Sequence, residues 1–175
     1  MPDTDVLHDS PEPEEVERFW ELVRHRLRLN PVPGYLGTYS SEVMAPPAWA
    51  FGATPEQADE LLTLVLAGTK TATASALWDY TETPDQMPKV GDLAILLDGR
   101  AHPRALIETM VVEVVPFDQV SAEHARLEGE GDRTLESWRT AHERFFTDHA
   151  EHDRGFSHDM PVVLEQFKLH YPDLP

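Results

Sequence analysis

One lysine, Lys70, stands among small and hydroxyl-bearing side chains in the stretch 68–75, GTKTATAS. A surface lysine normally has charged or long polar neighbours, whereas the threonines and alanines around Lys70 leave room for a ligand. An amine that is desolvated in such a pocket can act as a general base. The hydroxyl of Thr73, three positions later, is a candidate nucleophile. In an ideal strand the two side chains would point to opposite faces, so we expect a turn after Gly68 to bring them together.

A carboxylate, Glu108, is the third candidate catalytic group. It lies in a predicted strand over residues 104–117, where alternate positions form an apolar row: Leu106, Met110, Val112 and Val114. A buried carboxylate requires a cation or a strong hydrogen-bond donor nearby, and we expect Lys70 to fill that role. Two structural alternatives stay open: a purely structural Lys70–Glu108 ion pair, and a lysine that only complements a helix C-terminus.

The helix before Lys70 is the most clearly marked element in the sequence. Thr54, Pro55 and Gln57 form a helix-start signal with a capping residue, a proline in the first turn and a capping-box partner. Gly68 is the expected left-handed stop. The predicted buried stripe comprises Ala58, Leu61, Leu62, Val65 and Leu66.

The remaining elements predict an α+β fold, a small, mostly antiparallel β-barrel decorated with helices. An N-terminal helix begins at Glu14, with an apolar stripe of Val16, Phe19, Trp20, Val23 and Leu27, and a long loop with aromatic anchors covers residues 34–51. Strands are expected at 71–77, 93–97, 104–117 and 160–171, and helices at 121–127 and after Asp132, which is the expected N-cap of the last helix. The apolar face of that last helix is expected to contain Leu135, Trp138, His142, Phe145 and Phe146.

Length and charge restrict the class of protein. The chain has 175 residues, a net charge of -18 and no cysteine. The length predicts one domain, over residues 14–175 after a flexible acidic tail over 1–13, and the lack of cysteine predicts no disulfide. The first residues contain neither a basic nor an apolar segment and the apolar run at 93–97 is short, so we expect no signal peptide and no membrane span. We expect a cytoplasmic protein. The negative charge repels nucleic acids, so any RNA contact has to be local.

Several motifs together resemble the ASCH domain, a branch of the PUA-like superfamily. Gly68-x-Lys70-x-x-Thr73 is similar to the GxKxxT signature of that family. Further segments resemble the family in the same order: FW at 19–20, WAFG at 49–52, ADELLTLVLAGTKTATASALW at 58–78, KVGD at 89–92, IETMVVEVVPF at 107–117, EGEGDRTLESWRTAHERFF at 128–146 and DMPVVLEQF at 159–167. The resemblance covers almost everything after residue 15 and implies a PUA-like β-barrel.

The resemblance also implies a function. Family members include amidohydrolases acting on N4-acylated cytidines, ribonucleases and RNA-binding regulators, and the amidohydrolase set carries over onto Lys70, Thr73 and Glu108. The first hypothesis is therefore a hydrolase of a modified nucleobase that cleaves the amide of an N4-acylated cytidine without cofactor or metal. The alternatives are a ribonuclease acting on single-stranded RNA and a non-catalytic RNA-binding regulator. The partner would be a modified nucleoside or RNA. The candidate substrate-binding residues are Trp49, Phe51, Trp78, Asp132, Arg133, Trp138 and Arg139.

Two other motifs are interpreted as structural. The loop 128–132, EGEGD, has glycines spaced as in a phosphate cradle, but its three carboxylates would repel phosphate, so it is interpreted as a helix-entry loop. The histidines and aspartates of 149–159 lack the spacing of a zinc helix. His142 is interpreted as a hydrogen-bonded core histidine.

Overall fold

A computed structural model describes residues 10–27 and 44–173. Most of the predicted acidic tail and most of the predicted loop over 34–51 lie outside these residues. Within the described part, no helix is long and apolar enough to span a bilayer.

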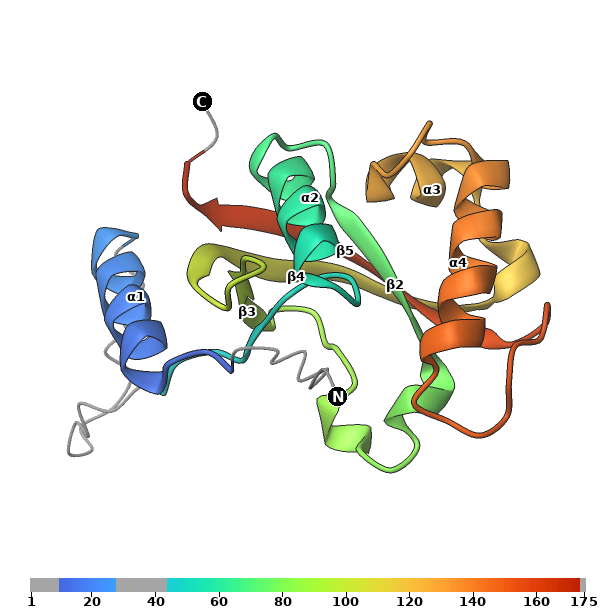
Figure 1. Ribbon diagram of the computed structural model, residues 1–175, viewed down its shortest axis with the longest axis horizontal. Helices are drawn as coiled ribbons and strands as arrows, with labels where there is room; N and C mark the ends of the chain where they lie inside the picture. Colours follow the sequence, from blue (N-terminus) through green and yellow to red (C-terminus); the bar gives the residue numbers. More distant parts are fainter. Residues whose placement is uncertain (1–9, 28–43, 174–175) are drawn as a thin grey trace, which may run out of the picture.

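Five strands of the described residues form one mixed sheet, which confirms the predicted α+β class and the mostly antiparallel pairing (Figure 1). The strand order is β1-β3-β4-β5-β2, and β1 and β3 form the one parallel pair within residues 10–27 and 44–173. The sheet is open, because β1 and β2 occupy its two edges. The strands are β1 (Ala48–Trp49), β2 (Ala72–Ala76), β3 (Leu93–Leu97), β4 (Pro103–Pro116) and β5 (Pro161–Tyr171).

In the part of the chain that the structure describes, four α-helices lie around this sheet. They are α1 (Pro13–Arg26), α2 (Pro55–Leu66), α3 (Ala122–Glu128) and α4 (Leu135–His149), and the short 3-10 turns are η1 (Leu77–Tyr80), η2 (Pro84–Gln86) and η3 (Phe117–Gln119). Figure 1 shows α1 at one end of the molecule, α3 and α4 at the other, and α2 over the sheet between them.

The predicted boundaries of α2 are confirmed. The Thr54 hydroxyl accepts a hydrogen bond from the Gln57 backbone N–H at 3.2 Å. Gln57 Oε1 accepts in turn from the Ala53 N–H at 2.8 Å, which satisfies a second free donor at the helix start. Gly68, with φ of 72°, ends the helical path. The chain therefore turns sharply just before Lys70.

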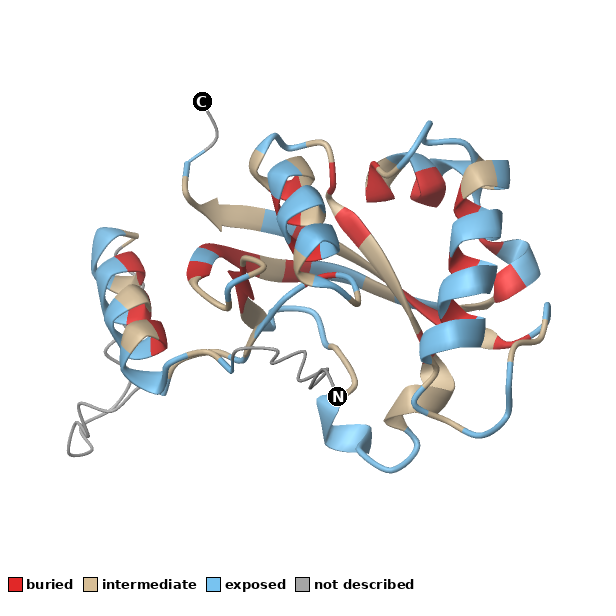
Figure 2. Cartoon of the chain, viewed as in Figure 1, coloured by how far each residue is buried: buried red, intermediate tan, exposed pale blue. Residues whose placement is uncertain are grey.

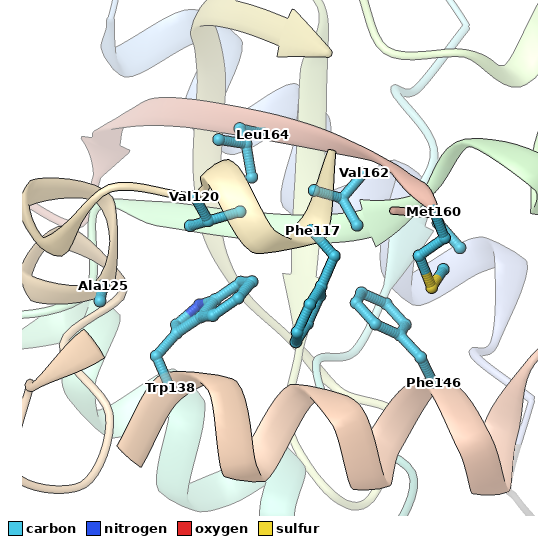
Figure 3. Packing of buried hydrophobic residues seen from close by; sticks show 9 residues of the cluster. Phe117, Val120, Ala125, Trp138, Phe146, Met160, Val162 and Leu164 are labelled. Carbon is cyan, nitrogen blue, oxygen red and sulfur yellow. The ribbon is translucent and has the colours of Figure 1, made fainter. Parts of the chain in front are cut away.

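Buried residues lie on the helix faces turned toward the sheet (Figure 2), and in the described part of the chain they form three apolar clusters. In the first, Trp138 and Phe146 of α4 pack around Phe117 below the β5 residues Val162 and Leu164 (Figure 3). The second joins α2 to the sheet through Phe51, Leu62, Val65, Leu96, Ala105, Ile107 and Phe167. The third joins α1 to β3 and β4 through Val16, Trp20, Val23, Ile95, Leu97 and Leu106.

Two details of α4 differ from the prediction. The N-cap is Thr134, whose hydroxyl accepts from the Ser137 N–H at 3.2 Å, while Asp132 accepts from the Thr134 N–H and hydroxyl. Phe145 is 39% exposed rather than part of the buried face. The reason is the neighbouring Phe146, whose ring fills the core position of that turn and rotates Phe145 outward.

Candidate functional site

An open groove of about 880 Å³ crosses the side of the sheet on which α2 lies. Its polar floor comes from three adjacent strands, with Thr73 on β2, Glu165 on β5 and Thr109 on β4. Tyr80 of η1 and Trp49 of β1 provide aromatic surface along its edges. The groove can accommodate a planar ligand of nucleoside size.

Thr73 and Glu165 lie directly opposite one another on antiparallel strands. Residues in such a pair share one face of the sheet, with Cβ atoms about 5 Å apart. Thr109 Oγ1 donates to Glu165 Oε2 at 3.2 Å. Neither the Thr73 hydroxyl nor Glu165 Oε1 has a hydrogen-bond partner among residues 10–27 and 44–173. A hydroxyl and a carboxylate oxygen are thus both available to a ligand.

The electrostatic environment of the groove raises two pKa values. Burial raises the pKa of the Glu165 carboxyl, the hydrogen bond from Thr109 opposes this, and the charge of Asp92 adds to the increase. Burial also raises the pKa of Tyr80, against a hydrogen bond with Ser75 and with the help of the Glu165 charge. A carboxyl with a raised pKa is a stronger base than an ordinary glutamate and suits proton transfer.

Lys70 is 1% exposed and lies between acceptors. Its Nζ donates to Glu130 Oε1 at 2.7 Å and to the Ala72 carbonyl at 3.0 Å. Glu128 Oε2 lies 3.7 Å away, and the Phe51 ring centroid 5.0 Å away. The Ala72 carbonyl belongs to the peptide group that joins Ala72 to Thr73. Lys70 therefore holds the start of β2 immediately before the candidate nucleophile.

Glu128 is the centre of a buried network between α3 and α4. One oxygen accepts from the Trp138 indole N–H at 2.8 Å and lies 2.9 Å from His124 Nε2. The other lies 3.1 Å from His142 Nε2. Burial by itself would raise the pKa of Glu128, but the charges and hydrogen bonds of His142, His124 and Lys70 outweigh it and hold that pKa well below the ordinary value. The prediction that His142 is a hydrogen-bonded core histidine is confirmed.

Gly129 explains how two glutamates approach one lysine. Its φ of 74° ends α3, and a Cβ atom there would lie 2.5 Å from the Thr69 carbonyl oxygen. Only glycine allows both the left-handed turn and this close approach. Residues 127–130 can then run along the segment 69–71, where the Thr71 N–H donates to the Leu127 carbonyl at 2.8 Å.

The predicted contact between Lys70 and Glu108 is wrong. Glu108 Oε2 lies 2.5 Å from His170 Nε2 on β5. Glu108 shares its face of β4 with Leu106, which packs against α1, whereas the next residue, Thr109, faces the groove. Farther along the row, Met110 and Val114 are 46% and 47% exposed, so the row is not a continuous buried face.

The aromatic candidates occupy three different environments. Trp49 lines the groove and makes an edge contact with Phe51, with 4.8 Å between ring centroids. Phe51 is buried beneath it, stacked on Phe167 and close to the Lys70 amine. Trp78 does not line the groove and instead contacts His152 and Arg154. Of these three candidates, Trp49 is the one that lines the groove and can contact a ligand directly.

Four of the candidate substrate-binding residues lie in α4 and in the loop before it, and each makes structural contacts instead. Trp138 is buried, stacked on His142 at 4.1 Å and bonded to Glu128, so it is not free to stack on a base. Asp132 supports the helix start. Arg133 donates to the Arg126 carbonyl and Arg139 to the Asp118 carbonyl. None of these four residues lines the groove.

Residues 47–171 match the family model of the ASCH domain. The chain belongs to the ASCH-domain family. Members of this family are associated with RNA-binding and hydrolase-like roles.

Solved structures agree with the ASCH assignment. Protein EF3133 from Enterococcus faecalis V583 is 33% identical, with a TM-score of 0.77 over 91% of this chain and 92% of that one. An ASCH domain from Lactobacillus crispatus JV V101 is 31% identical, with a TM-score of 0.76 over 93% of this chain and 98% of that one. The search of curated proteins gives no match.

Sequence reasoning missed three carboxylates of this ASCH domain. Glu128 and Glu130 are interpreted from the sequence as part of a helix-entry loop, although both lie beside Lys70. Glu165 was not selected, although it alternates with Leu164 and Val162 of the core and so had to face the other side of β5. That alternation was a usable signal for Glu165. For Glu128 and Glu130 the only signal was their spacing around Gly129.

Proposed function

We propose that this ASCH domain is a hydrolase of a modified nucleobase that cleaves the amide of an N4-acylated cytidine in the groove. The observation that carries the proposal is the pairing of Thr73 with Glu165 across adjacent strands on the groove floor. A hydroxyl next to a carboxyl of raised pKa is a nucleophile with a proton acceptor within reach. The aromatic side chains of Trp49 and Tyr80 suit a planar base.

The reaction proceeds by acyl transfer. The Thr73 oxygen attacks the acyl carbon, the C–N bond to the exocyclic nitrogen breaks, and cytidine leaves. Water then hydrolyses the threonine ester and releases the acid. Lys70 is a positioning residue in this scheme, because it holds the peptide group before Thr73 and is itself held by Glu130. Glu108 has no part in it.

Charge supports a nucleoside rather than RNA as the substrate. Three acids line the groove, Asp85, Asp92 and Glu165, and its lining contains no lysine, arginine or histidine among the described residues. The chain as a whole carries a net charge of -18. Phosphate groups would be repelled from such a groove, whereas an uncharged nucleoside would not.

The test is turnover of N4-acetylcytidine by the purified protein, with a structured RNA as the competing substrate. We expect acetate and cytidine as products, at a rate that changes little between 50 and 500 mM salt or with EDTA. Thr73→Val should abolish turnover, while Thr140→Val on the exposed side of α4 should not. RNA cleavage without release of acetate would overturn the proposal in favour of a ribonuclease. Binding of RNA that weakens steeply with salt, without turnover of either substrate, would indicate a regulator.

A further inference from the structure

We propose that Glu165 is the proton relay of the groove, accepting the proton of the Thr73 hydroxyl and passing it to the departing amine. This inference rests on the proposed function. It assigns a catalytic role to a residue outside the Lys70, Thr73 and Glu108 set that the sequence indicated.

The two carboxylate oxygens of Glu165 have different roles: one accepts a hydrogen bond from Thr109, and the other is available to accept a proton. Oε2 accepts from Thr109 at 3.2 Å, which fixes the orientation of the carboxyl on the groove floor. Oε1 has no hydrogen-bond partner in the described part of the chain. Thr73 lies opposite on β2 and on the same face of the sheet, where the Cβ atoms of such a pair are about 5 Å apart, so the hydroxyl is close to this carboxylate.

Glu165 can accept and return the proton both when the threonine ester forms and when water hydrolyses it. In the first step Glu165 takes the proton from Thr73 as the oxygen–carbon bond forms. It then gives that proton to the nitrogen as the C–N bond breaks, leaving an ester on Thr73 and an ionised Glu165. In the second step Glu165 takes a proton from water, which attacks the ester, and returns it to the threonine oxygen. No oxidant, reductant or further reactant is required.

The groups that face Glu165 shift its pKa in opposite directions. Thr73 faces it from β2, Thr109 from β4, Tyr80 from η1, and Asp92 from the turn before β3. The Thr109 hydrogen bond lowers the pKa of Glu165, while the Asp92 charge raises it. The relay begins with the ionised form, so the rate falls when acidification protonates Glu165.

Two substitutions therefore shift the pH profile in opposite senses. Thr109→Val removes the hydrogen bond, which moves the acid limb of kcat/KM to higher pH. Asp92→Asn removes the charge, which moves the limb to lower pH. Thr140→Val on α4 is the matched control and leaves the limb in place. A 13C-NMR titration of the Glu165 carboxyl, without substrate, should show the same two shifts, and a titration that does not move with either variant would overturn the relay.

Acetylation by p-nitrophenyl acetate separates the relay from the choice of substrate. This ester should acetylate Thr73, as detected by peptide mass, and Glu165→Gln should slow the reaction at least about a hundredfold. Wild-type protein without acetylated Thr73, or a Glu165→Gln variant as reactive as wild type, would overturn the relay. Acetylation that depends on Glu165 in a protein that leaves N4-acetylcytidine intact would support the relay and overturn the proposed function.

Discussion

The Nζ atom of Lys70 lies 2.7 Å from Oε1 of Glu130, a residue 60 positions later in the chain. The same amine holds the carbonyl of Ala72, so the pair ties the loop after α3 to the start of β2. An ordered β2 places Thr73 opposite Glu165. Lys70 thus contributes to the site through backbone position and not through a contact with Glu108.

Removal of the Lys70 charge should destabilise the fold. In Lys70→Met the carboxylate of Glu128 loses its lysine partner inside the protein, and breaking a buried pair from one side costs about 3 kcal/mol or more. Urea unfolding of this variant measures the loss, with Lys89→Met, at an exposed lysine, as the control that should change stability by less than about 0.5 kcal/mol. A Lys70→Met protein as stable as wild type would contradict a structural role for the pair.

Glu108→Gln should leave turnover unchanged. Glu108 lies on the α1 side of β4, paired with His170, and does not line the groove. Loss of this partly exposed pair should cost at most about 1 kcal/mol of stability. Kinetics with N4-acetylcytidine and a thermal melt measure the two quantities. A fall in kcat of more than tenfold would return Glu108 to the mechanism.

Glu128→Gln should reduce stability by about 3 kcal/mol at neutral pH, because the buried Lys70 ammonium loses one of its carboxylate partners. The pKa of Glu128 is lowered in the folded state, so its stabilising effect is complete above the ordinary value of 4.5 and is lost as the pH falls towards the folded value. The stability gap between wild type and variant should therefore narrow below about pH 4.5. Urea unfolding at several pH values measures this difference in unfolding free energy, with the exposed Glu136→Gln variant as the control. A difference that stays constant with pH would contradict the lowered pKa of Glu128.

Glu165→Gln should raise the melting temperature at neutral pH while it lowers activity. The pKa of Glu165 is raised in the folded state, so the folded protein binds the proton more tightly than the unfolded chain does. Wild type then loses stability as the pH rises through that folded pKa, and a neutral glutamine does not. The difference in melting temperature between wild type and Glu165→Gln should vanish at acid pH. Melting curves at several pH values measure this difference, with the exposed Glu113→Gln variant for comparison. A Glu165→Gln melting temperature below that of wild type at neutral pH would refute the expectation.

Local signals in the sequence determined much of the fold. The Thr54 cap, the stripe of α2 and Gly68 each act within a few residues, so they predicted the helix and the turn that presents Lys70. Strand periodicity placed β2 to β5 within a residue or two of their observed bounds. The GxKxxT string and the ordered motifs identified the ASCH domain.

The tertiary structure alone decided which charges meet. Alternation along β4 placed Glu108 with Leu106, but α1 covers only part of that face, and its extent depends on helix packing. Lys70 meets Glu128 and Glu130 because Gly129 lets the end of α3 run along residues 69–71, a contact between segments about 60 residues apart. The groove likewise needs β2, β5 and β4 side by side, with Thr73 and Glu165 in register. Such pairings depend on strand order and on the approach of distant backbones, which no local pattern of residues specifies.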